Sequence, residues 1–177
     1  MNSLVFLARG WITLTLMLQR HRARQVLGGG PAVLADFFSP RLLGATWFVC
    51  VDAMPSPPLA GLLLGRTGGR LFDRHDQGAD GLTLRNTYFL LPHVCGEASL
   101  HCHELVHVCQ WRLLGERRFL AIWLEQIRRG RYHDNPLERI AFRVQGEFDS
   151  AGRPFDAERR VRDLLLAAGL RGLASLP

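Results

Sequence analysis

The chain has 177 residues, of which 47% are hydrophobic, and a formal net charge of +6. This length and hydrophobic content suit one compact domain with its own core, and the sequence has no internal repeat or linker that would divide it. Arginine supplies all the positive charge, since the sequence contains no lysine. The arginines are scattered, and no recognition-helix or RNA-binding signature accompanies them. The charge therefore does not predict a nucleic-acid partner.

The N-terminal part of the chain is predicted to be helical. We expect one helix over residues 4–26, ended by the Gly28–Gly30 run, and a short helix over residues 31–37 that ends near Pro40. The apolar run Trp11–Leu18 is shorter than the roughly twenty residues that span a bilayer, and no A-x-A-like cleavage site follows it. These features favour an amphipathic helix packed on the domain of a cytoplasmic protein, with membrane-surface contact as the alternative.

Two segments have the composition of β-strands. Thr46–Val51 contains the apolar run W-F-V-C-V, which is typical of a buried strand. Leu82–Leu91 (L-T-L-R-N-T-Y-F-L-L) also has strand composition and stops at Pro92. Between the two we expect a brief helix over Leu59–Leu64, followed by a loop rich in glycine and arginine that runs to Gly81.

The four cysteines do not form a metal-binding pattern. No C-x-x-C pair occurs among Cys50, Cys95, Cys102 and Cys109, so they do not predict a structural zinc site. Cys102 and Cys109 are seven residues apart and share one helical face, which is typical of small core side chains. No disulfide is expected.

The segment Leu100–Gln110 (L-H-C-H-E-L-V-H-V-C-Q) contains an H-E-x-x-H motif. It lies in a predicted helix from about Glu97 to Leu114, in which residues four apart differ by about 40° around the axis. The imidazoles of His103 and His107 therefore point the same way and can bind one Zn²⁺. Glu104 lies beside them, where it can polarise a water molecule on the metal.

The surroundings of this motif are apolar on nearly all sides, which is typical of a buried helix. Buried imidazoles and carboxylates need strong partners, because an unpaired buried charge costs several kcal/mol. A bound metal ion would satisfy His103, Glu104 and His107 together. In the alternative interpretation, the two histidines are core residues that hydrogen-bond to the backbone or to Glu104.

Catalytic zinc usually has three protein ligands and one position open to water. The longer motif H-E-x-x-H-x-x-G-x-x-H is excluded, because Gln110 and Leu113 occupy the positions of its glycine and its third histidine. A later segment offers another candidate ligand. There, Asn135 can cap a helix that begins at Pro136 and carries Glu138 in its first turn.

Two interpretations of Glu138 remain open. A carboxylate held at the start of a helix can be the third metal ligand. Alternatively, Asn135-x-x-Glu138 is a capping box, in which the glutamate only bonds the backbone N–H of the cap residue. Asp134 and His133 are further candidates for the third ligand.

Further helices complete the predicted fold. The motif helix should stop at Gly115, and the next helix should cover Glu116–Arg129. The helix of Glu138 is expected to continue to about Gln145. A final helix over about Asp156–Ala168 has a predicted buried side formed by Val161, Leu164, Leu165 and Leu166.

Taken together, these motifs resemble those of small bacterial zincins of the gluzincin type. The similarity rests on H-E-L-V-H-V at residues 103–108, Gln110, the Gly115 helix stop and N-P-x-E-x-x-A at residues 135–141. It covers about Gly81–Arg143. Gluzincins are zinc metallopeptidases that take two histidine ligands from H-E-x-x-H and a glutamate ligand from a later helix.

The resemblance implies that His103, His107 and Glu138 bind Zn²⁺ and that Glu104 is the general base for cleavage of a peptide or protein substrate. It also implies a minimal zincin-like α+β domain, mainly helical, with a small β-sheet packed on the H-E-x-x-H helix. The single domain over residues 1–177 is expected to have an N-terminal helical part (1–45), a metal-site core (46–145) and a C-terminal helix (155–168).

One position departs from the family pattern. Thermolysin-like members carry E-x-x-x-D, in which the aspartate supports a ligand histidine, whereas the corresponding residue here is Phe142. The residue that orients His103 is therefore not identified from the sequence. The resemblance also implies that the strand Leu82–Leu91 borders the substrate cleft and pairs with an extended peptide. An ordinary central strand is the alternative.

A donor to the developing oxyanion is expected near the metal, because preorganised donors supply much of the rate enhancement in such reactions. Tyr132 and His133, which precede the Glu138 helix, and Tyr88, on the predicted strand, are the candidates. In the alternative interpretation, each is a surface or packing aromatic.

Two other functions fit parts of the pattern. The first is a non-catalytic interaction module that keeps the zincin scaffold. The second is a structural metal site, which would need a fourth protein ligand such as His133 or His101. His101 lies two residues before His103 and thus about 200° away around the helix, so we expect it to face elsewhere.

Overall fold

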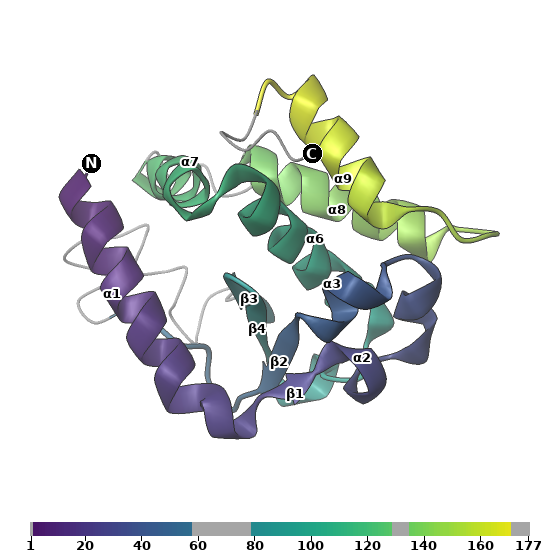
Figure 1. Ribbon diagram of the computed structural model, residues 1–177, viewed down its shortest axis with the longest axis horizontal. Helices are drawn as coiled ribbons and strands as arrows, with labels where there is room; N and C mark the ends of the chain where they lie inside the picture. Colours follow the sequence, from purple (N-terminus) through teal and green to yellow (C-terminus); the bar gives the residue numbers. More distant parts are fainter. Residues whose placement is uncertain (1, 58–78, 129–134, 171–177) are drawn as a thin grey trace.

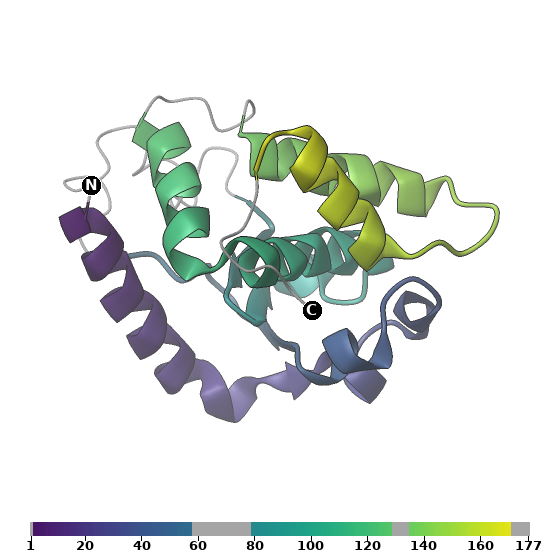
Figure 2. The same ribbon diagram turned by 45° about the horizontal axis from the view of Figure 1, so that its top comes forward.

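Helix α6 (Ala98–Leu114) lies at the centre of the fold, between a four-stranded sheet and the helices α8 (Pro136–Asp149) and α9 (Ala157–Ala167) (Figure 1). Figure 2 shows the same three layers from a second direction. The computed structural model describes residues 2–57, 79–128 and 135–170. In this part the chain is mixed α+β and mainly helical, as expected.

The other elements precede α6 or link it to α8. The short 3-10 helices are labelled η. In chain order these elements are α1 (Asn2–Gln19), η1 (Arg20–Arg22), β1 (Arg24–Gln25), α2 (Val26–Gly29), η2 (Ala32–Asp36), α3 (Pro40–Gly44), β2 (Trp47–Cys50), β3 (Gly81–Leu84), β4 (Thr87–Leu90), η3 (Pro92–Val94) and α7 (Glu116–Arg128). The helix expected over Leu59–Leu64 lies outside the described residues.

The sheet has the strand order β1-β2-β4-β3. β2 and β4 are parallel, with Val49 opposite Phe89, whereas β1 pairs with β2 and β3 pairs with β4 in antiparallel fashion. The buried strand predicted around β2 is confirmed, since Phe48 and Val49 are almost fully inaccessible to solvent. Strand β3 forms one edge of this sheet and lies against α6.

The prediction of one strand over Leu82–Leu91 is wrong, because this segment is a hairpin of β3 and β4. The turn is formed by Arg85 and Asn86, and Arg85 has a left-handed backbone with φ of 59°. Such a conformation is unusual for a residue with a long side chain. Tertiary contact stabilises it here, because the Arg85 guanidinium forms an ion pair with Glu116 of α7 at 2.7 Å.

The N-terminal helix is shorter than predicted. It ends at Gln19, and Arg24 and Gln25 form β1 instead, because their backbone pairs with Phe48 and Trp47. The short helix predicted over residues 31–37 is confirmed as the 3-10 helix η2, but it ends at Asp36 rather than near Pro40. Pro40 begins α3, and the Ser39 side chain caps this helix by accepting a hydrogen bond from the Leu42 N–H at 3.2 Å. Both corrections follow from pairing or capping partners that the apolar pattern does not reveal.

Helix α6 matches its predicted bounds and stops at Gly115, whose φ of 75° is accessible to glycine. Its side chains are buried on all sides, as the apolar surroundings of the motif indicated. The buried residues of α6 are His101, Cys102, His103, Glu104, Leu105, Val106, His107, Val108, Cys109, Gln110, Trp111 and Leu114.

Helix α8 continues past the predicted end near Gln145 to Asp149. Contacts with other elements hold this extra turn, because Glu147 pairs with Arg160 of α9 and the Phe148 ring contacts Phe37 at 4.7 Å between centroids. Helix α9 agrees with its prediction except at Leu166. That side chain is about half exposed, whereas Val161, Leu164 and Leu165 are buried.

A disulfide joins Cys50, at the end of β2, to Cys95, which follows η3. The expectation of no disulfide is therefore wrong. The two residues meet because parallel pairing places Cys50 opposite Leu90, and η3 then turns the chain back. Disulfides persist mainly in oxidising compartments, so this bond does not support the predicted cytoplasmic residence. Cys102 and Cys109 are free and buried, as expected.

Candidate metal centre

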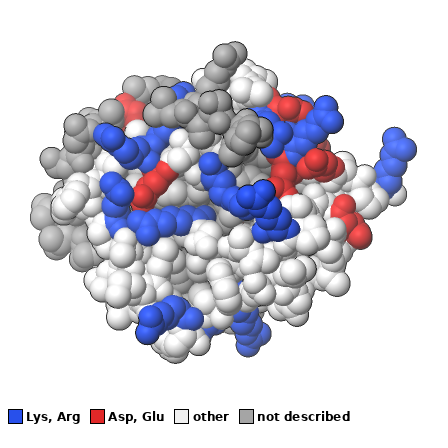
Figure 3. Space-filling view, viewed as in Figure 1, with Lys and Arg blue, Asp and Glu red and all other residues white. Residues whose placement is uncertain are grey.

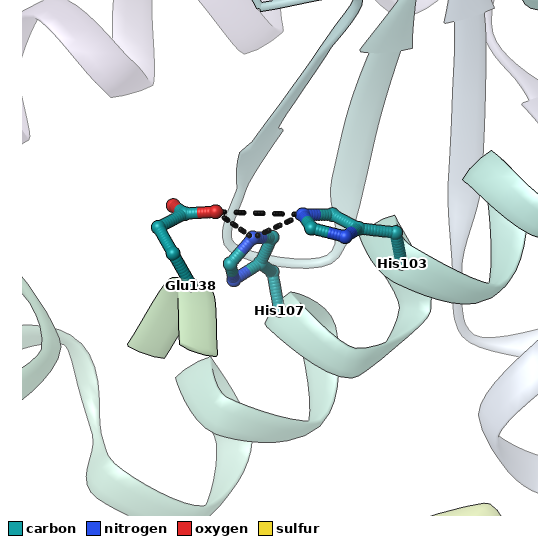
Figure 4. Close-up of side chains that lie close together, drawn as sticks. All are labelled: His103, His107 and Glu138. Atoms are coloured by element: carbon teal, nitrogen blue, oxygen red, sulfur yellow. Dashed lines mark hydrogen bonds and ion pairs between the residues drawn. The ribbon is translucent and has the colours of Figure 1, made fainter. Parts of the chain in front are cut away.

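The two histidines of the H-E-x-x-H motif lie one helical turn apart on α6, and both are buried. Their Nε2 atoms are 3.2 Å apart. Figure 4 shows both rings turned with these nitrogens toward the same point. The four-residue spacing on a helix accounts for this convergence, as the sequence indicated.

Glu138 approaches the same point from the first turn of α8. Its Oε2 atom lies 3.4 Å from His103 Nε2 and 3.3 Å from His107 Nε2, and the carboxylate is buried. One ligand atom from each of the three residues lies within 4.8 Å of the others, so the group could hold a metal ion.

The position of Glu138 decides between the two interpretations that the sequence left open. Asn135 caps α8 by accepting a hydrogen bond from the Leu137 N–H at 3.0 Å. The Glu138 carboxylate faces the histidines, so the geometry of a metal ligand is favoured over that of a capping box. The alternative ligands Asp134 and His133 lie outside the described residues.

Each of the two histidines is oriented by a glutamine through its other ring nitrogen, Nδ1. His103 Nδ1 lies 2.9 Å from Gln145 Oε1, and His107 Nδ1 lies 2.8 Å from Gln110 Oε1. An amide oxygen only accepts hydrogen bonds, so each Nδ1 carries a proton, and in the neutral form of each ring Nε2 has the free lone pair. Both imidazoles therefore have the tautomer that a metal bound at Nε2 requires.

The two amides are themselves held in place. Gln110 Nε2 donates to the Leu137 carbonyl at 2.9 Å, which ties this support to the residue beside Glu138. Gln145 Nε2 donates to Ser99 Oγ at 2.8 Å, and the Ser99 hydroxyl donates to Asp149 at 2.9 Å. This series of hydrogen bonds, from Gln145 through Ser99 to Asp149, links α6 and α8 beside the histidine pair.

Gln145 supplies the support for His103 that the sequence did not identify. Phe142, the residue at the position of the aspartate in thermolysin-like enzymes, packs edge-to-face with the His103 ring, with 4.7 Å between centroids. Gln145 lies seven residues after Glu138 and so on the same face of α8, and this spacing was the signal that could have found it. Similarly, Gln110 lies three residues after His107 on α6.

Glu104 is buried between the histidines and the edge strand β3. The Thr83 hydroxyl of β3 donates a hydrogen bond to Glu104 Oε2 at 2.5 Å. Gly81, at the start of β3, lies so close that an added Cβ would come within 2.2 Å of Glu104 Oε1. Sequence reasoning missed Thr83 and Gly81, since only the folded hairpin brings them to α6.

Burial and charge act in opposite directions on the pKa values of this group. Burial raises the pKa of Glu104 above its usual value, against the lowering effect of His107 and His103. Burial alone would also raise the pKa of Glu138, but the positive charge of His107 and hydrogen bonds from both histidines hold it well below its usual range. Burial would lower the pKa of His107, yet the Glu138 carboxylate raises it to about 9.

The remaining candidates from the sequence do not join the group. His101 faces away from His103, as expected, and its ring bonds to the Tyr88 hydroxyl and the Cys95 carbonyl. Tyr88 is fully buried with its hydroxyl 2.5 Å from His101 Nδ1, so the prediction of Tyr88 as an oxyanion donor is wrong. Tyr132 and His133 lie outside the described residues.

The fold and the site define an α+β protein with a buried His-His-Glu group that could bind a metal ion. Comparisons of the chain with protein-family models, with curated proteins and with solved structures find no match.

Proposed function

We propose that this protein is a zinc metallopeptidase with a zincin-like fold. The observation that carries the proposal is the convergence of His103, His107 and Glu138 on one point, with Glu104 beside them on α6. Two imidazole nitrogens and one carboxylate oxygen are a ligand set typical of catalytic zinc, and a set of three leaves one position open. The resemblance of the motifs to gluzincins supports the same assignment.

The residues of the chain have separate tasks in the proposed reaction. A bound zinc ion would lower the pKa of a water molecule and polarise the substrate carbonyl. Glu104 accepts the proton of this water as its oxygen attacks the carbonyl carbon. When the C–N bond breaks, Glu104 returns the proton to the departing amine. Thr83 holds the carboxylate of Glu104 in position through its hydrogen bond.

An extended peptide is the substrate that β3 can accept. Within the described residues, β3 is an edge strand that pairs only with β4, so its other side has backbone groups open to pairing. A peptide added to this edge would gain backbone hydrogen bonds with little dependence on its side chains. Gly81 and Thr83 contact Glu104, so the added peptide would pass close to the metal group.

The test combines metal analysis with two substitutions. The purified protein should contain one zinc per chain and hydrolyse a quenched fluorescent peptide library. Glu104→Gln should keep the zinc and lose hydrolysis, whereas His103→Ala should lose both. Zinc retention without hydrolysis in the unaltered protein would favour the non-catalytic module. A protein that binds no zinc, or a Glu104→Gln variant of unchanged activity, would contradict the proposal.

A further inference from the structure

Helix α1 exposes a large apolar face. Phe6, Leu14 and Met17 are 73%, 57% and 62% exposed, and two neighbouring leucines, Leu7 and Leu18, are also more than half exposed. On a helix these five positions fall within an arc of about 120°. The opposite side contains Ile12, which is buried in the core. The helix is therefore apolar on the side that packs on the domain and on the side that faces outward.

Such a face requires an explanation. Single exposed hydrophobic residues are common on soluble proteins, but a contiguous apolar patch marks an interaction surface. Figure 3 shows that the surface over the lower half of α1 is mostly white, with a blue group at its lower end. None of the described helices is long and apolar enough to cross a membrane. The exposed apolar face of α1 is thus suited to contact with another surface along the length of the helix, rather than to crossing a membrane.

Cationic residues follow directly at the C-terminal end of α1. Arg20, Arg22 and Arg24 are exposed, and His21, Arg22 and Arg24 line a hollow together with Cys50. The sequence before Asp36 contains no acidic residue. Figure 3 shows blue groups at the lower edge of the molecule, with no red group beside them. This end of the molecule therefore complements an anionic surface.

We propose that α1 attaches the protein to a membrane surface that contains anionic lipids. The helix lies along the interface, with Phe6, Leu14 and Met17 in the boundary between headgroups and acyl chains. Arg20 and Arg24 lie against the lipid phosphates. A second copy of the chain fits this surface less well, because its residues 1–35 would bring only the same cationic residues and no acidic partner for them. The proposal does not depend on the function of the metal group.

The test is co-sedimentation of the full chain with lipid vesicles. The protein should bind vesicles made of equal parts phosphatidylcholine and phosphatidylglycerol, bind poorly to phosphatidylcholine alone, and dissociate as the salt concentration rises. The double variant Leu14→Gln and Met17→Gln should bind at least about tenfold more weakly. The variant Arg20→Gln and Arg24→Gln should lose about thirtyfold in affinity for the anionic vesicles only.

A matched control is Leu166→Gln, which alters an exposed leucine on α9, away from α1, and should bind like the unaltered protein. Circular dichroism of each variant checks that it is folded. Three results would overturn the proposal: no binding of the unaltered protein to anionic vesicles, equal binding by the α1 double variant, or a dimer in solution that the same double variant abolishes while vesicle binding is absent.

Discussion

His103, His107 and Glu138 are held by contacts between helices, whereas Glu104, the residue after His103, is held by the edge of the sheet. The first group depends on α6, on α8 and on the two glutamines that orient the rings. The position of Glu104 depends on Thr83 and Gly81 of β3. The comparison indicates that the proposed metal binding and the proposed proton transfer can be altered separately, although His103 and Glu104 are neighbours on α6.

The largest expected effect is on the helix side of this comparison. Glu138→Ala removes one of the three proposed metal ligands and leaves two histidines, so zinc affinity should fall by more than about 100-fold, which is the upper loss typical of a merely supporting residue. Equilibrium competition with a fluorescent zinc chelator measures the affinity. If Glu138→Ala retained zinc at the original affinity, Glu138 would not be a ligand.

Gly81→Ala tests the sheet side. The added methyl group would collide with Glu104 Oε1, so the carboxylate must shift. A misplacement of a catalytic group by about 1 Å can cost about 100-fold in rate, so we expect a loss of this order in kcat. The zinc content should stay at one per chain. Gly96→Ala is the matched control, because a Cβ at Gly96 meets no atom within 4 Å. Joint loss of zinc and activity in Gly81→Ala would show that the two sides are not separable.

Gln145→Ala sharpens the comparison on the helix side. Without the amide oxygen, the His103 ring is no longer fixed at Nδ1, and zinc affinity should fall between about tenfold and about 100-fold. Gln145→Glu keeps an acceptor at this position and should recover most of the affinity. Glu147→Ala on the same helix, which loses the ion pairs with Arg160 and Arg143, should leave the affinity unchanged. If all three variants bound zinc with the affinity of the unaltered protein, the proposed support of His103 by Gln145 would be excluded.

The smallest effect concerns the metal-free protein, in which the pair of His107 and Glu138 contributes to stability. The pKa of His107 is raised to about 9, so its contribution is complete below its ordinary value of 6.5 and is lost as the pH rises through about 9. The pKa of Glu138 is lowered, so its contribution is present above its ordinary value of 4.5 and is lost on acidification.

The free energy of unfolding of the metal-free protein should therefore fall between about pH 6 and about pH 9.5, more than in the His107→Ala variant. Urea denaturation at a series of pH values, after removal of metal by a chelator, measures this difference. A pH dependence shared by both proteins would mean that His107 does not carry the effect.

The local part of the site could be predicted from the sequence, because it depends on spacing along a single helix. The four-residue interval placed both histidines on one face, and the Asn135-Pro136 helix start placed Glu138 on a rigid element. Likewise, the bounds of α6 followed from its apolar surroundings and from Gly115.

The rest depends on contacts between distant segments. The Arg85-Asn86 turn contains no glycine, so the sequence did not indicate a hairpin. The edge strand β3 and its contact with Glu104 were therefore not predicted. Gln145 reaches His103 only because α8 packs on α6, and the same packing supplies the Leu137 carbonyl that holds the Gln110 amide beside His107. The Cys50–Cys95 disulfide forms only because β2 and β4 are neighbours in the sheet.

The most direct test of the central claim is a crystal structure with diffraction data collected on both sides of the zinc absorption edge. The account predicts one anomalous peak between α6 and α8, about 2.0–2.2 Å from His103 Nε2, His107 Nε2 and a carboxylate oxygen of Glu138. A zinc-loaded crystal with no peak at that point, or with the metal bound by other residues, would contradict it.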